Sequence, residues 1–89
     1  AELDQSELAL PLIEKALEIN EARYGKDHLV VAQTLDVMGN VFCGVGRPVE
    51  ANHVLQRALK IRVQQLGPQH PQVALTKFNL ANAIMDLAG

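Results

Sequence analysis

The chain has 89 residues, of which 48% are hydrophobic and 20% are charged, so it is long enough and apolar enough to fold around a modest core. Its formal net charge is −2 with Lys and Arg scattered along the chain, which argues against a nucleic-acid-binding or anionic-membrane surface. With 3% aromatic residues and no Trp, the core must consist mainly of Ala, Leu, Ile and Val, which suits closely packed helices.

The cysteine content gives a weak indication of the cellular compartment, and the chain ends give a weak indication that the sequence is a fragment. The single cysteine, Cys43, cannot form an internal disulfide, which favours a reducing, cytoplasmic compartment. The sequence shows no apolar run of membrane-spanning length and no secretory signal. It begins at Ala1 without Met and ends at Gly89 in mid-pattern, so we interpret it as a fragment of a longer chain.

The first predicted helix covers about residues 6–24. Ser6 is a suitable N-cap, and Gly25 can adopt the left-handed conformation that ends a helix. Pro11 falls near the first turn, where we expect a local bend. The apolar stripe at helical spacing comprises Leu8, Leu12, Ile13, Ala16, Leu17 and Ile19.

Three further helices are predicted, over about residues 29–43, 48–66 and 71–88. Pro48 suits a first helical turn because its φ is already fixed, and Gly67 with the following proline ends the third helix. Short loops between these helices require antiparallel neighbours. In the last helix the residues expected to point inward are Val73, Ala74, Leu80, Ile84 and Leu87.

The chain repeats itself with a period of 42 residues. The identities that join the two copies are Ala9/Ala51, Ala16/Ala58, Leu17/Leu59, Ile19/Ile61, Gly25/Gly67, His28/His70, Val31/Val73, Ala32/Ala74, Thr34/Thr76 and Asn40/Asn82. Self-similarity at such a period indicates a solenoid, in which each unit buries its apolar face only against its neighbours. The expected functional site is therefore a surface made by stacking and not a buried catalytic pocket.

The repeat resembles a known family. The motif residues are Leu35, Met38, Gly39, Phe42 and Gly46, followed by Ala51, Leu55 and Ala58. This pattern looks like the tetratricopeptide repeat, whose usual length is 34 residues, with a large-small-large first helix and an Ala-large-Ala second helix. The 42-residue period and the segments ALEI, YGKDH and LGPQHPQVA are similar to the longer variant found in kinesin light chains.

The resemblance implies an all-α fold of antiparallel helical hairpins stacked as a right-handed solenoid. The first helix of each repeat is called A and the second B. The four helices then follow in B-A-B-A order: an orphan B helix at about 6–24, a full repeat at about 30–66 and an orphan A helix at about 72–88. A helices would line a concave groove, and B helices would lie outside. Apolar stripes on both end faces would stay uncovered, which offers a route to self-association, because such arrays usually need three repeats and polar caps.

The same resemblance assigns groove-facing residues to the two A helices. Asn40 and Asn82 are equivalent and would form a short ladder, whose amides can bond to the backbone of an extended peptide. Alternatively, these amides bond to neighbouring helices and fix the superhelix. The full set is Gln33, Asp36, Val37, Asn40 and Cys43 on the first A helix and Leu75, Phe78, Asn79, Asn82 and Met85 on the second.

Two residues depart from the family pattern. Phe78 stands where a polar residue is usual, and Lys77 stands where a large apolar residue is usual. Either Phe78 belongs to the core or an end face, which we favour, or it is an exposed anchor for a partner. Kinesin light chains bind acidic, Trp-containing cargo peptides, but Asp36 and Asp86 offset Lys77, so this ligand preference is not carried over.

No pattern points to catalysis, a cofactor or a metal. His28 and His70 each precede an A helix, about one helix pair apart, which is too far to share a metal; capping or loop packing is expected. No nucleophile–base pair, phosphate-binding loop or zinc spacing occurs. We therefore predict a non-enzymatic interaction module or scaffold that binds a partner peptide or helix. The alternative is a purely structural spacer or self-association segment of a larger solenoid.

Overall fold

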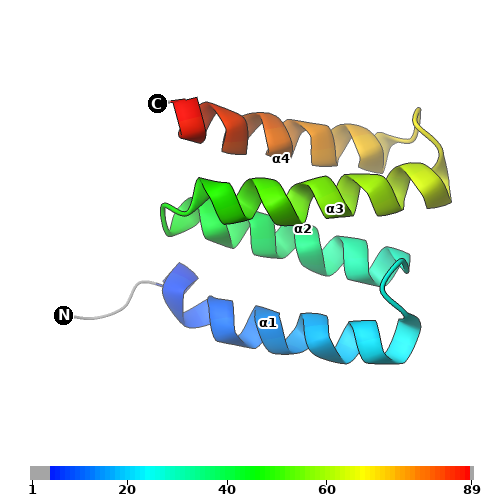
Figure 1. Ribbon diagram of the computed structural model, residues 1–89, viewed down its shortest axis with the longest axis horizontal. Helices are drawn as coiled ribbons and strands as arrows, with labels where there is room; N and C mark the ends of the chain where they lie inside the picture. The colour runs from blue at the N-terminus through cyan, green and yellow to red at the C-terminus, as the bar shows by residue number, and fades with distance from the viewer. Residues whose placement is uncertain (1–4, 89) are drawn as a thin grey trace.

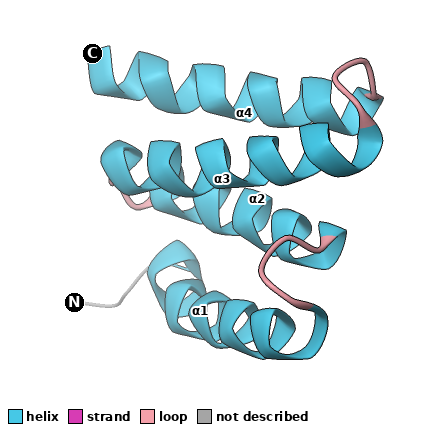
Figure 2. Cartoon of the chain, turned by 45° about the vertical axis from the view of Figure 1, so that its right-hand side comes forward, coloured by secondary structure: helices cyan, strands magenta, loops and turns pink. Residues whose placement is uncertain are grey.

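A computed structural model describes residues 5–88, which form four α-helices (Figure 1). α1 covers Gln5–Tyr24, α2 Leu29–Gly44, α3 Pro48–Leu66 and α4 Pro71–Ala88. Short loops join the helices, and no strand occurs within residues 5–88 (Figure 2). The predicted all-α fold is confirmed, with helix bounds that differ from the prediction by one residue at the start of α1 and at the end of α2.

Glycine, proline and histidine set the helix ends. Gly25 and Gly67 follow α1 and α3 with φ of 92° and 89°, in the region that favours glycine. His28 Nδ1 accepts a hydrogen bond from the Val30 N–H at 3.0 Å, and His70 Nδ1 accepts one from the Gln72 N–H at 3.1 Å. The predicted capping role of both histidines is thus confirmed.

α1 differs most from its prediction. The helix continues through Pro11, and the side chain of Ser6, its predicted N-cap, lies outside what the structure describes. The buried residue on α1 is Leu10, which the predicted stripe did not include, whereas Leu12 is 73% exposed. Leu8, Ala16 and Ile19 are exposed too. Their face is open because no other described helix lies against it.

The core lies mainly between α2 and α3. Leu35, Leu55 and Ala58 are almost completely buried there. Gly39 permits the close approach of the two helices, because a Cβ at this position would lie 2.5 Å from Leu55 Cγ. The small residue of the large-small-large pattern is therefore required by packing.

The inward face of α4 was only partly predicted. Val73 and Leu80 are buried as expected, but Ala74, Ile84 and Leu87 are exposed. Thr76 and Ala83 are buried in their place. α4 packs on α3 and α2 by this side, while its opposite side faces no described helix (Figure 1).

The order of contacts gives the array its curvature. α2 packs against α1, α3 and α4, so the two A helices run side by side as predicted. The backbones of α1 and α3 do not come into contact anywhere in residues 5–88, although Arg57 on α3 forms an ion pair with Glu21 on α1. An array whose A helices touch while its B helices stay apart is concave on the side of α2 and α4. None of the helices in residues 5–88 is both long and apolar enough to cross a bilayer.

Candidate partner-binding groove

The concave side carries a hollow between the first turns of α2 and α4. Its volume is about 430 Å³. α2 contributes Leu29, Val30 and Gln33, α4 contributes Gln72 and Leu75, and Arg62 of α3 completes the lining. Five of these six residues come from the A helices that the sequence assigned to the groove or from their first turns, and the hollow is open to solvent.

Most of the predicted groove residues lie at the surface. Gln33, Asn40 and Asn82 are exposed, as are the apolar side chains of Val37 and Leu75. Met85 is exposed as well, and Asn79 and Cys43 are half-buried. Phe78 is 64% exposed, so it does not belong to the core of residues 5–88; no described helix covers its side of α4, which leaves the end-face and partner-anchor interpretations open.

Asp36 is the exception, and its predicted exposure in the groove is corrected. Only 7% of it is exposed. Its Oδ2 accepts a hydrogen bond from Arg62 Nη1, which also donates to Thr76 Oγ1 at 2.8 Å. Thr76 Oγ1 lies 3.3 Å from the same Asp36 oxygen. The carboxylate thus links α2, α3 and α4 beneath the groove and is not presented to a partner.

Burial and the neighbouring groups have opposite effects on the pKa of Asp36. Burial raises the pKa of Asp36, while the Arg62 charge and hydrogen bonds from Thr76, Asn79 and Arg62 oppose the rise. Two buried atoms, Asp36 Oδ1 and Arg62 Nε, have no hydrogen-bond partner among the described residues. The pair therefore depends on both members being present, since either charge alone would be buried without compensation.

Sequence reasoning missed Arg62, although the repeat contained a signal. In the first copy, Asn20 Nδ2 donates to Thr34 Oγ1 at 2.9 Å. Asn20 and Thr34 are the 42-residue counterparts of Arg62 and Thr76, so the same contact joins each B helix to the next A helix. The identity of Thr34 and Thr76 was visible in the sequence. The partner position was not recognised because it is Asn20 in one repeat and Arg62 in the other.

The two equivalent asparagines have free amides. No hydrogen bond joins the side chain of Asn40 or Asn82 to another residue within 5–88, and both residues are exposed. Their amides are therefore available to a ligand in this structure. This observation favours the binding interpretation over the one in which they fix the superhelix.

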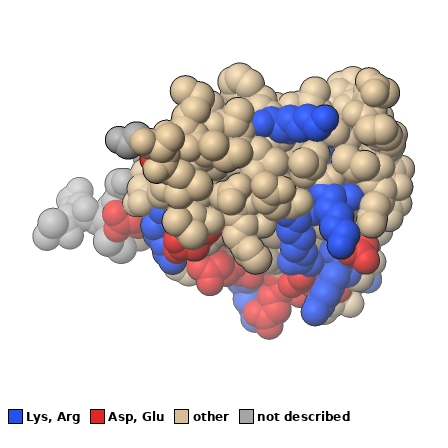
Figure 3. All heavy atoms as spheres, turned by 45° about the horizontal axis from the view of Figure 1, so that its top comes forward, with Lys and Arg blue, Asp and Glu red and all other residues tan. Residues whose placement is uncertain are grey.

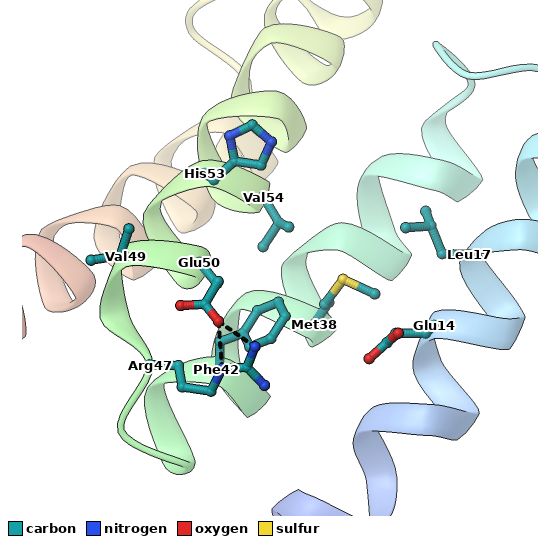
Figure 4. A pocket seen from close by; sticks show the side chains of 9 residues that line it. All are labelled: Glu14, Leu17, Met38, Phe42, Arg47, Val49, Glu50, His53 and Val54. Carbon is teal, nitrogen blue, oxygen red and sulfur yellow. Dashed lines mark hydrogen bonds and ion pairs between the residues drawn. The ribbon is translucent and has the colours of Figure 1, made fainter.

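A second hollow, of about 650 Å³, lies between α1 and α3 on the opposite side (Figure 4). Met38 and Phe42 of α2 lie at its base, between Leu17 of α1 and Val54 of α3. Charged residues line its rim, where Arg47 forms an ion pair with Glu50 and also lies over the Phe42 ring. The hollow follows from the separation of the two B helices.

Within residues 5–88, neither Cys43 nor the acidic side chains belong to a group suited to bind a metal ion. Burial raises the pKa of the Cys43 thiol, and the nearby Asp86 carboxylate adds to the rise, so the thiol stays protonated. No group of three or more His, Cys, Asp or Glu side chains suited to a metal ion occurs within the described residues.

Comparison with known proteins identifies the repeat. The family model of the tetratricopeptide repeat matches residues 1–62, which include α1, α2 and most of α3. No curated protein sequence matches the chain significantly.

Proposed function

Because the chain belongs to the tetratricopeptide repeat family, whose domains generally mediate protein–protein interactions, we propose that it binds a partner peptide or helix in the groove between α2 and α4. The groove would act as part of a longer repeat scaffold. We also propose the longer, kinesin-light-chain-like subtype, for which the 42-residue period and the loop segments are the support.

The free amides of Asn40 and Asn82 are the observation that carries this proposal. An amide side chain supplies a donor and an acceptor, which match the alternating N–H and C=O groups of an extended backbone. Exposed apolar side chains lie on the same two helices, namely Val37, Leu75, Phe78 and Met85. The partner segment is therefore expected to present apolar side chains together with an accessible backbone.

The charge of the surface supports an uncharged partner segment. The charged residues of α4 are Lys77 and Asp86, and the surface over this helix is almost uncharged in Figure 3. The Arg62 charge is matched by Asp36 beneath the groove. An acidic segment therefore gains little here, and apolar contact provides most of the binding free energy.

Peptides selected on the wild-type chain from a random display library provide the test. Asn40→Ala combined with Asn82→Ala should weaken their binding by about thirtyfold, at roughly 1 kcal/mol for each of the two lost hydrogen bonds, as measured by fluorescence anisotropy. The urea midpoint should not change, because neither amide bonds within residues 5–88. Gln56→Ala with Gln64→Ala, on the exposed outer side of α3, is the matched control and should bind normally.

The structural alternative gives a different result in the same experiment. If these repeats are only a spacer, the asparagine double variant changes the melting temperature or the oligomer size. Peptide selection on the wild-type chain would then yield no ligand that the double variant fails to bind. Either of these results would contradict binding in the groove.

A further inference from the structure

The outer side of α4 is an apolar face that no described helix covers. Ala74, Ala81 and Ile84 lie on it and are exposed. Their spacing places them along one side of the helix, next to the side on which Val73, Leu80 and Ala83 are buried. Lys77 is the one charged residue within this arc.

The 42-residue repeat shows how the equivalent face of α2 is covered. The counterparts of Ala74, Ala81 and Ile84 are Ala32, Gly39 and Phe42. These three residues are buried, α2 packs against α3, and Gly39 lies directly against Leu55 of α3. The exposed face of α4 therefore corresponds to the face of α2 on which the B helix α3 packs.

α1 carries the complementary face. Its residues Ala9, Leu12, Ile13, Ala16 and Ile19 are the counterparts of Ala51, Val54, Leu55, Ala58 and Ile61 on α3. All five α3 residues are buried in the core, whereas all five α1 residues are exposed or half-buried. One end of the molecule thus presents the A-helix half of a hairpin, and the other end presents the B-helix half.

We propose that two copies of the 89-residue chain associate head to tail, with α1 of one copy packed antiparallel on α4 of the other as α3 packs on α2. In this arrangement Ile13 of one copy faces Ala81 of the other, as Leu55 faces Gly39 within the chain. The contact joins two different surfaces, so it leaves a free α1 and a free α4 at the ends and permits further addition. It does not depend on the groove or on its proposed ligand.

Two differences between α4 and α2 make the contact between chains weaker than the contact between α2 and α3. Lys77 stands in place of the buried Leu35, so its amine must reach solvent along the edge of the interface. Ala81 replaces Gly39, where the internal packing leaves no room for a Cβ. The association should therefore be reversible and dependent on concentration.

Sedimentation velocity on a concentration series tests the proposal. The wild-type chain should form dimers and longer species as concentration rises. Ala16→Glu and Ala81→Glu should each remain monomeric, because a carboxylate would be buried in every contact. Ala22→Glu is the matched control: its α3 counterpart, Gln64, is exposed, and it should associate like the wild type. Circular dichroism verifies that each variant is helical.

Mixing the two monomeric variants distinguishes the head-to-tail contact from any other. The Ala16→Glu chain keeps an intact α4 face, and the Ala81→Glu chain keeps an intact α1 face. An equimolar mixture should therefore form a one-to-one heterodimer that does not grow further. A wild-type chain that stays monomeric at every concentration overturns the proposal, and so does a mixture without heterodimer.

A substitution of Lys77 provides an independent test, in which association should become tighter. Lys77→Leu restores the residue type of Leu35 and should tighten association by about tenfold, because an apolar side chain replaces an ammonium at the interface. Lys60→Leu makes the same change on the exposed side of α3 and should leave the dissociation constant unchanged. Equal effects of the two substitutions would indicate nonspecific apolar association and would overturn the proposal. The asparagine double variant should associate normally, so a failure of groove binding leaves this result intact.

Discussion

At the scale of single residues, the buried pair of Asp36 and Arg62 lies where the second A helix joins the first repeat. Arg62 bonds to both Asp36 and Thr76, so one guanidinium connects α2, α3 and α4. A buried ion pair adds little stability compared with an apolar pair of similar size, but the loss of one member leaves an uncompensated charge. The pair is therefore more important for defining this junction than for strengthening it.

The removal of Arg62 alone should be more harmful than the removal of both charges. Arg62→Leu leaves a desolvated carboxylate and is expected to lower the free energy of unfolding by about 3–5 kcal/mol, as measured by urea denaturation. Asp36→Asn on this background should restore a large part of the loss. An additive double variant, with no recovery, would show that the two side chains act independently.

The same variants have an expected pH dependence. Burial already raises the pKa of Asp36 above its ordinary value of 3.8, and the loss of the Arg62 charge raises it further. The stability contributed by a group with a raised folded-state pKa is fully present below the unfolded value and is lost as the pH rises through the folded one. The Arg62→Leu chain should thus gain stability relative to the double variant as the pH is lowered from about 7 toward about 4. A constant difference between them would contradict this assignment.

At the scale of helices, the histidine caps repeat in both loops. His28 and His70 each accept a hydrogen bond from the N–H two residues later, which satisfies one of the free donors at the start of an A helix. Their surroundings differ, since the His28 ring also stacks on Tyr24 at a centroid distance of 4.8 Å. His70 therefore isolates the capping contribution better.

His70→Ala should lower the free energy of unfolding by about 1 kcal/mol, because one N–H of the first turn of α4 loses its acceptor. His70→Asp should preserve or raise stability, since a carboxylate accepts the same hydrogen bond and favours the positive end of the helix dipole. Urea denaturation monitored by circular dichroism measures both changes. Equal losses in the two variants would show that the imidazole ring and not its acceptor nitrogen is required.

The helix bounds could be predicted from the sequence because local residues determine them. Gly25 and Gly67 end helices by their positive φ, Pro48 begins α3, and the histidines cap α2 and α4. The faces of the end helices could not be predicted in the same way. Helical spacing shows that a stripe is apolar, but whether Leu12 or Ile84 is buried depends on whether another helix lies against it.

The candidate site shows the same limit. The period and the family pattern located Asn40 and Asn82 on the two A helices, and both are exposed there. Asp36 occupies a groove position by the same pattern, yet it is buried because Arg62, from a different helix, pairs with it. A contact between residues far apart in sequence decided this outcome, and position within a repeat does not encode it.

At the scale of the whole molecule, helix packing within residues 5–88 is concentrated in the central hairpin. α2 packs against all three other helices, and α3 packs against α2 and α4. α1 has one buried apolar side chain, Leu10, and α4 is covered on one side only. Because each helix of a repeat array depends on its neighbours, the end helices should open more readily than the middle ones.

Amide hydrogen exchange measures this gradient. In the monomeric Ala81→Glu chain, amides of α2 and α3 should exchange most slowly, near the rate set by global unfolding, while those of α1 and α4 exchange faster through local opening. In the wild-type chain at high concentration, protection should increase mainly in α1 and α4, because head-to-tail contact covers these two helices and binding stabilises what it covers. Uniform protection of all four helices in the monomer would show a single cooperative unit instead. An increase confined to α2 and α3 would place the contact between copies elsewhere.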